Sequence, residues 1–189
     1  DLADPGATFI KWAAADDEHA PDYLSTTVAL LEDDPSAALA HTGTADIDED
    51  GYVLRVRNQP VECLASFDPA ERMRDLVTLR HECFGAFGLI RHGVERATRG
   101  LGAYSDADNV LLVEIALRGR MRYDDRTLFC RRQPPARSIT AYPDARTRGE
   151  WFDSGLTDVL PFPTWRVGWE LRRAVRDAPL SAAERRRCY

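Results

Sequence analysis

The chain has 189 residues, enough for one domain with a substantial core, and its 31 acidic and 25 basic side chains give a net charge of −6. This charge argues against general binding to nucleic-acid phosphates, and the chain contains neither an apolar run long enough for a transmembrane helix nor a signal-peptide pattern. Four widely spaced cysteines without a C-x-x-C pair predict neither a zinc site nor a disulfide framework, which favours a reducing cytoplasm.

The first predicted elements surround an acidic corner. Residues 9–12 are bulky strand formers, and small alanines then carry the backbone to Asp16 and Asp17. Pro21 suits the first turn of a helix, which we expect to continue to Asp34. The predicted apolar face of that helix comprises Leu24, Val28 and Leu31. Two adjacent carboxylates after a strand can hold a divalent cation that also binds phosphate, and helix-capping acids in a solvated turn are the alternative.

Strand and helix patterns alternate in the next part of the chain. We expect an inner strand at residues 37–45, which contains His41 as a structural residue, and an alternating strand at 52–56. Asp68 followed by a proline is a strong helix start, and the pattern predicts a helix as far as His81.

Two glycines interrupt the apolar run at residues 83–91. Glycine in such a run indicates either strand packing or close approach of the backbone to a ligand. Residues 100–108 form a flexible approach to an almost wholly apolar helix at 109–117. Two strands, at 121–123 and 128–131, are then expected on either side of an acidic turn.

The last part of the chain contains two predicted helices. Residues 138–155 are rich in proline and glycine and predict no regular element. A helix is expected at 164–178, and Ser181 with Glu184 forms a capping box that starts a second helix. The predicted inner face of the first helix comprises Val167, Leu171, Ala174, Val175 and Ala178.

Residues 9–54 together resemble the middle of a family 2 glycosyltransferase with the GT-A fold. In that family a strand ends in a DxD-type motif, which is followed by a helix, a strand and an IDEDG turn, present here at 47–51. Asp16 matches the second acid of the motif, Asp17 lies beside it, and Ala14 stands where the first acid would be. The resemblance extends over nearly the whole chain but covers only the second half of the family's domain. We therefore expect the nucleotide-binding first half to be missing from this sequence.

The resemblance implies an α/β fold and an enzymatic activity. Residues 1–137 would be the acceptor-side half of a GT-A domain, the nucleotide-diphospho-sugar transferase fold, and 138–189 a loop-rich linker with a helical tail. The implied reaction is inverting transfer of a sugar, of the hexosyltransferase type, from a nucleotide-sugar donor to an acceptor hydroxyl. Asp16 and Asp17 would bind Mg²⁺ or Mn²⁺, which neutralises the departing diphosphate.

The stretch from Gly102 to Glu114 resembles the family's GpyxxxDxxLLxEL motif. The acid before the helix is the catalytic base in that family, so the resemblance implies that Asp108 takes the proton of the acceptor hydroxyl. The residues alone favour a helix cap at Asp106 or Asp108. Glu114 is interpreted as structural.

The resemblance also implies a set of residues near the donor. They are Asp16, Asp17, Gly85, Arg131 and Arg132. Pro134 stands where related sequences often carry DHP. Together with Ala14, this departure suggests weak or altered metal binding, so a non-catalytic binding module or inactive homologue of the same fold is the alternative function.

Two further contacts are predicted from the sequence. The carboxy-terminal helices carry Trp165, Trp169, Arg172, Arg173, Arg176 and three arginines at 185–187, a composition typical of an interfacial helix at a membrane or partner. Packing against the chain's own domain is the alternative, because Glu170 and Asp177 interrupt the basic residues. A GT-A sheet cut in half also leaves an uncovered edge, which favours self-association.

Overall fold

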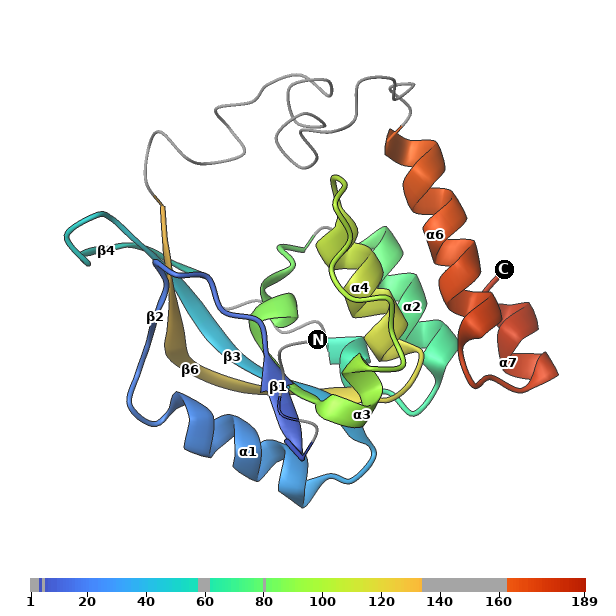
Figure 1. The fold of residues 1–189 in the computed structure, drawn as a ribbon, viewed down its shortest axis with the longest axis horizontal. Helices are drawn as coiled ribbons and strands as arrows, with labels where there is room; N and C mark the ends of the chain where they lie inside the picture. Colours follow the sequence, from blue (N-terminus) through green and yellow to red (C-terminus); the bar gives the residue numbers. More distant parts are fainter. Residues whose placement is uncertain (1–3, 5, 58–61, 80, 134–162) are drawn as a thin grey trace.

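The protein has a mixed α/β fold in which helices cover both faces of a central sheet (Figure 1). The computed structural model describes residues 4, 6–57, 62–79, 81–133 and 163–189. Helix α1 (Tyr23–Asp33) lies on one face, and α2 (Pro69–Thr78), α4 (Ala107–Ala116) and α6 (Pro163–Asp177) lie on the other. Shorter helical segments are η1 (Glu62–Ala65), η2 (Phe84–Phe87), α3 (His92–Glu95) and α7 (Ala182–Arg187). None of the helices in these described ranges is both long and apolar enough to cross a bilayer.

The sheet contains six strands in the described part of the chain. They are β1 (Phe9–Lys11), β2 (Glu18–His19), β3 (Ala37–Ile47), β4 (Val53–Arg57), β5 (Leu89–Arg91) and β6 (Arg120–Arg132). The order is β1-β5-β3-β6-β2, with β4 paired to the end of β3. Only β3 and β6 pair in parallel among these strands, but β1 also points in their direction, because β5 is antiparallel to both β1 and β3.

Several strand predictions were wrong in their boundaries. A single strand, β6, replaces the two strands predicted around an acidic turn. It stays paired with β3 along its whole length, because the pairing takes up the acidic residues through shifts of register near Thr42 and Gly43. The same pairing extends β3 to Ile47, beyond the predicted end at Ala45. Most of the apolar run at 83–91 forms the helical segment η2, and only its last residues form a strand, β5. The short strand β2 was not predicted.

Helix α1 buries a face different from the predicted one. It begins at Tyr23 instead of Pro21, and its buried residues are Tyr23, Thr27 and Leu31, whereas Leu24 is exposed. The Tyr23 hydroxyl donates a hydrogen bond to the Phe87 carbonyl oxygen (3.0 Å), and the ring packs in a cluster with Phe129. Because the large Tyr23 side chain is buried, the buried face of α1 passes through Tyr23 and Thr27 instead of the predicted Leu24 and Val28.

The predicted start of α2 is confirmed. Asp68 accepts a hydrogen bond from the Ala70 amide (2.9 Å) as the N-cap, and Pro69 occupies the first turn. The helix ends at Thr78, before the predicted end at His81. Its buried Arg72 donates from Nε to the Ala116 carbonyl oxygen (2.6 Å), which fixes α2 to the end of α4.

The main hydrophobic core lies between the sheet and α4, and α6 closes it from outside. Helix α4 is buried on nearly all sides, as its apolar sequence predicts. Ala174 and Val175 of α6 are fully buried in this core, Ala178 joins them and Leu171 packs against it, which confirms the predicted inner face at four of its five residues. The capping box of α7 is also confirmed. The boundary predicted at 137/138, the segment 138–155 and Pro134 lie outside the described residues.

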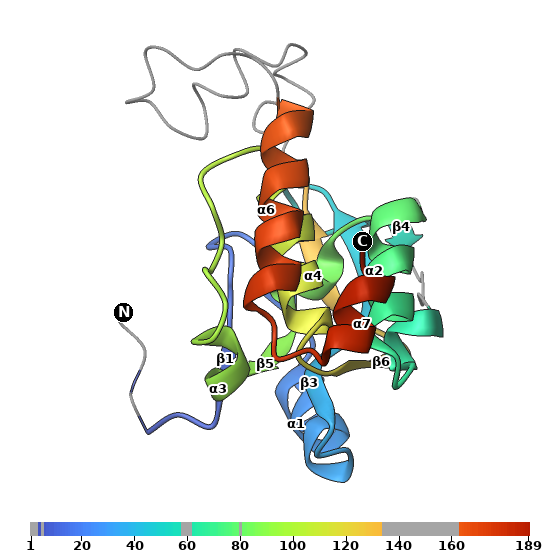
Figure 2. The same cartoon turned by 90° about the vertical axis from the view of Figure 1, so that its right-hand side faces the viewer.

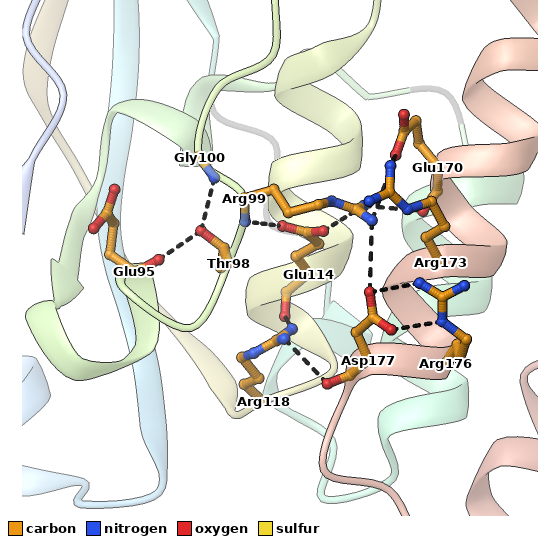
Figure 3. Close-up of polar contacts among 10 residues, drawn as sticks. All are labelled: Glu95, Thr98, Arg99, Gly100, Glu114, Arg118, Glu170, Arg173, Arg176 and Asp177. Atoms are coloured by element: carbon orange, nitrogen blue, oxygen red, sulfur yellow. Dashed lines mark hydrogen bonds and ion pairs between the residues drawn. The ribbon is translucent and has the colours of Figure 1, made fainter.

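Ion pairs fix α6 to α4 and to the loop before it (Figure 3). The buried Glu114 pairs with the Arg99 guanidinium and accepts a hydrogen bond from the Arg99 amide (2.9 Å). Arg99 continues to the Glu170 carbonyl oxygen on α6 (3.1 Å), and Arg118 donates to the carbonyl oxygens of Glu114 (2.8 Å) and Asp177 (3.5 Å). These contacts agree with a structural role for Glu114.

Candidate functional site

The candidate site lies at the carboxyl ends of the parallel strands β3 and β6. Asp46 and Ile47 of β3 are in register with Arg131 and Arg132 of β6, so both strands end at the same level. Strand β1 ends earlier along the sheet, because Lys11 is level with Ala40 in the first half of β3. The chain after β1 then rises along the sheet to reach the end of β6 (Figure 1).

The acidic corner contacts the end of β6. Asp17 Oδ1 accepts a hydrogen bond from the Arg132 amide (3.0 Å), and the Asp16 carbonyl oxygen accepts one from Arg132 Nε (3.0 Å). Burial raises the pKa of Asp17, as does the adjacent Asp16, whereas the Arg132 amide, Arg131 and Lys11 oppose the rise. Asp16 is exposed and Asp17 is half-buried. The acidic corner was predicted at the carboxyl end of the strand at residues 9–12. It lies instead against the carboxyl end of β6, several residues after β1 has ended.

Lys11 lies against aromatic rings beside this corner. Its ammonium is 5.4 Å from the Tyr23 ring centroid and 5.3 Å from that of Phe129, and it donates to the Trp12 carbonyl oxygen (2.9 Å). His19 stacks on the Phe129 ring at 5.1 Å. Burial lowers the pKa of Lys11 to about 8, although the negative charge of Asp17 opposes this. Sequence reasoning did not select Lys11 as a site residue. The available signal was that it is the only lysine.

A second cluster surrounds the buried carboxylate of Asp46. Its Oδ2 pairs with Arg57 Nε (2.7 Å), and its Oδ1 pairs with Arg131 Nη2 (3.0 Å) and accepts a hydrogen bond from Gln133 Nε2 (3.3 Å). The Arg131 guanidinium also lies 4.8 Å from the Phe84 ring centroid. Asp46 directly precedes the IDEDG turn, and no role was predicted for it from the sequence. Asp46 thus holds Arg131 at the end of β6.

Arg132 is held by backbone and side-chain oxygens of two loops. Its Nη1 donates to the carbonyl oxygens of Asp48 (2.5 Å) and Glu49 (2.7 Å), and its Nη2 pairs with the carboxylate of Glu18. The IDEDG turn and the acidic corner are therefore joined through one guanidinium. The sequence resemblance selected Arg132 but could not indicate these partners.

Gly85 is buried in η2 and packs against α4. A Cβ atom at this position would lie 3.2 Å from Leu112 Cδ2, so the close approach of α4 favours glycine here. At Gly88 a Cβ atom would lie 2.7 Å from the Ala40 carbonyl oxygen, which excludes a side chain. Packing is therefore sufficient to explain both glycines.

Asp108 lies half-buried in the first turn of α4. Its Oδ1 accepts a hydrogen bond from the next amide, Asn109 N (2.8 Å). The N-cap position belongs to Asp106, which has a φ of 64° and makes no side-chain capping hydrogen bond. Burial raises the pKa of the Cys83 thiol, and the neighbouring carboxylates of Asp108 and Asp106 raise it further.

The acidic corner and Asp108 are connected through η2. Cys83 lies beside Asp108, its neighbour Phe84 lies under the Arg131 guanidinium, and Arg131 acts electrostatically on Asp17. The chain thus brings the two predicted acidic groups to the same end of the sheet. It also places a basic residue between them.

His41 has the properties of a structural residue. Burial lowers its pKa to about 4, and its ring centroid lies 4.9 Å from that of Tyr123. Its Nδ1 is buried and makes no hydrogen bond among the residues described. The imidazole is therefore neutral at neutral pH, in agreement with the prediction.

The two carboxylates of the acidic corner fit a cation that is shared with a substrate. The described residues contain no group of three or more His, Cys, Asp or Glu side chains placed to hold a metal. Mg²⁺, however, is commonly bound through one or two carboxylates together with substrate phosphates. Asp16, which is exposed, and Asp17, whose second oxygen is not used by the Arg132 amide bond, could supply those carboxylates.

Comparison with known proteins does not assign the chain to a family. Its sequence matches no protein-family model and no curated protein. The fold and the site therefore define a mixed α/β protein with an acidic and basic cluster at the carboxyl ends of its parallel strands.

Proposed function

We propose that this chain is the acceptor-side part of an inverting glycosyltransferase with the GT-A fold. The observation that carries the proposal is the meeting of the DxD-like acidic corner, the two arginines of β6 and the start of α4 at one end of the sheet. Ligands in α/β proteins bind at this end of the strands. The sequence resemblance of residues 9–54 and of the stretch before α4 supplies the reaction class.

Asp108 is proposed as the general base. Its carboxylate takes the proton of the acceptor hydroxyl while the hydroxyl oxygen bonds to C1 of the sugar and the bond from C1 to the nucleotide diphosphate breaks. Asp108 lies half-buried in the first turn of α4, at the end of the helix that faces the carboxyl ends of β3 and β6. Such a base typically contributes about two to four orders of magnitude in rate.

The acidic corner is proposed to face the donor diphosphate. A Mg²⁺ or Mn²⁺ ion bound there would neutralise charge on the leaving diphosphate. Asp17 is oriented by the Arg132 amide, and Asp16 is exposed to a ligand. Arg131 and Arg132 contribute positive charge to the same end of the sheet, and Gly85 lets η2, which carries Phe84 under Arg131, pack closely against α4.

A non-catalytic binding module of the same fold is the second candidate. It is favoured by the pairing of Arg131 with Asp46 and of Arg132 with Glu18, because both guanidinium groups already have carboxylate partners. Ala14 in place of the first acid of the motif also favours it. Such a module would bind a nucleotide sugar and catalyse no transfer.

The decisive experiment compares Asp108→Asn with the parent protein. The assay uses UDP-, dTDP- and GDP-sugars with Mn²⁺, and it includes whatever segment the gene encodes before Asp1, because the family's nucleotide-binding half precedes this region. Asparagine keeps the size of aspartate but cannot take a proton. We expect turnover to fall by about two to four orders of magnitude with donor affinity, measured by isothermal titration, nearly unchanged.

The neighbouring Asp106→Asn provides the matched control. Asparagine tolerates the left-handed backbone at this position, so turnover should stay near that of the parent. Retained turnover in Asp108→Asn would reject the catalytic assignment. Donor binding without transfer by the parent protein would favour the binding module.

A further inference from the structure

Helix α6 presents an aromatic and basic face away from the core. Trp165, Trp169, Arg172 and Arg176 recur at helical spacing and are all exposed, with Trp165 at 80% and Trp169 at 62% of their full accessibility. We call these four residues the outer face of α6. Figure 2 shows α6 along the side of the molecule that faces the viewer, with α7 beside it. The C-terminal Tyr189 joins this face, because the Arg172 guanidinium lies 5.5 Å from its ring centroid.

Only one of the two acidic residues of α6 interrupts the outer face, and it does so at the end of the helix. Glu170 points inward, its side chain being only 14% exposed, and pairs with Arg99 of the loop before α4 and with Arg173 (Figure 3). Asp177 binds Arg176 (2.7 Å) and lies 3.9 Å from Arg99. One acid is thus turned toward α4, and the other neutralises Arg176 at the end of the helix.

The charge of the chain is unevenly distributed. Residues 163–189 contain seven arginines and three acidic residues, whereas the whole chain has a net charge of −6. The two carboxy-terminal helices are therefore a basic region of an acidic protein. An anionic partner is attracted to this region and repelled by the rest of the molecule.

We propose that the outer face of α6 binds the surface of an anionic membrane. Tryptophan is favoured at the membrane interface because its ring is apolar while its indole N–H can still reach polar groups. Arginines beside exposed tryptophans can contact lipid phosphates. This inference does not depend on the proposed sugar transfer, because it rests on a different surface of the molecule.

The test is cosedimentation with vesicles of phosphatidylcholine, with and without phosphatidylglycerol. We expect the protein to bind the vesicles that contain phosphatidylglycerol and to dissociate as salt is raised. The double variant Trp165→Ser, Trp169→Ser should bind about tenfold more weakly, and Arg172→Gln about fivefold more weakly.

Matched controls lie at the opposite side of the molecule in Figure 1. Tyr52→Ser removes an exposed aromatic ring next to β4, and Arg55→Gln removes an exposed positive charge on that strand. Both should bind vesicles as the parent does. Thermal melts of all variants check that each is folded.

Three outcomes would overturn the inference. The first is absence of binding to the anionic vesicles, and the second is equal binding by the double tryptophan variant. The third is binding to an acidic polypeptide such as polyglutamate but not to vesicles, with the same dependence on Trp165 and Trp169, which would make the outer face a protein-binding surface.

Discussion

Lys11 shows how the fold changes the chemistry of a single residue. Burial against Tyr23 and Phe129 lowers its pKa to about 8 from 10.5, with Asp17 opposing the shift. Between these two pH values the unfolded chain binds more protons at this residue than the folded chain. The free energy of unfolding that Lys11 contributes therefore increases as pH rises from about 8 to 10.5. At pH values below about 8 the amine is charged in both states, and the folded protein bears the full cost of burying that charge.

The corresponding prediction concerns Lys11→Met. Methionine has no charge to bury, so the variant does not bear the cost that the charged Lys11 imposes on the folded parent. The parent loses this cost as its amine deprotonates, so the free energy of unfolding of the variant minus that of the parent should decrease as pH is raised from about 8 toward 10. Urea unfolding of both proteins at several pH values measures the difference. In the control Arg55→Met, the exposed arginine stays charged throughout, so the difference from the parent should not change with pH. A constant difference for Lys11→Met would contradict the lowered pKa.

Individual site residues could be predicted from the sequence only where a local pattern marked them. Asp16, Asp17 and Asp108 lie next to recognisable strand or helix boundaries. Asp46 was missed as a central residue because its partner Arg131 is 85 positions away and reaches it only through the parallel pairing of β3 with β6. No local spacing encodes that contact.

At the scale of elements, helices with clear caps or wholly apolar sequences were predicted well. The N-cap of α2, the burial of α4 and the inner face of α6 follow from side-chain chemistry within each segment. Strand β6 and the segment η2 were not predicted correctly, because β6 depends on pairing with β3 and η2 depends on packing against α4. Tertiary contacts decided these elements.

Strand β4 is an exposed edge with apolar residues on both faces. Val53, Leu54 and Val56 are all exposed, and β4 pairs only with the last residues of β3 among the strands described. Successive side chains of a strand point to opposite faces, so both faces of β4 are apolar. An unprotected edge of this kind favours pairing with another copy of the chain.

We therefore predict self-association through β4. Sedimentation velocity of the chain should show a sedimentation coefficient that increases with concentration. The double variant Leu54→Lys, Val56→Lys should weaken association by about tenfold or more, since charges on an edge oppose strand pairing. Leu24→Lys on α1 is the matched control, because Leu24 is 56% exposed and Leu54 is 59% exposed. A parent protein that remains monomeric at all concentrations would refute the prediction.

At the scale of the whole molecule, α6 belongs to the same folded unit as the sheet. The sequence suggested a domain at 1–137 followed by a linker and tail, but Ala174 and Val175 are fully buried in the core that contains α4. The ion pairs of Arg99 with Glu114 and Glu170 reinforce this contact. Periodicity indicated which face of α6 is apolar. It could not indicate that this face packs on α4.

This arrangement predicts a large effect of shortening the chain before α6. Full burial of one Val-sized side chain contributes about 1.5–3 kcal/mol, so loss of the whole inner face should remove roughly 4–8 kcal/mol. That is comparable to the total stability of about 5–15 kcal/mol of a typical domain. A chain ending at residue 162 should therefore unfold at much lower urea or fail to fold cooperatively.

A chain ending at Leu180 is the control that separates α6 from α7. Helix α7 has no buried residue, and Arg187 forms an ion pair with Asp68 at the surface (3.0 Å). Arg185 also donates hydrogen bonds to the carbonyl oxygens of Val175 (3.3 Å) and Ala178 (3.2 Å), and the partly buried Cys188 packs against the core. Removal of residues 181–189 should lower the free energy of unfolding by about 2–3 kcal/mol, less than the loss of α6. If the chain ending at residue 162 instead unfolded at the same urea concentration as the parent, α6 would be an independent tail and the core would end at the sheet and α4.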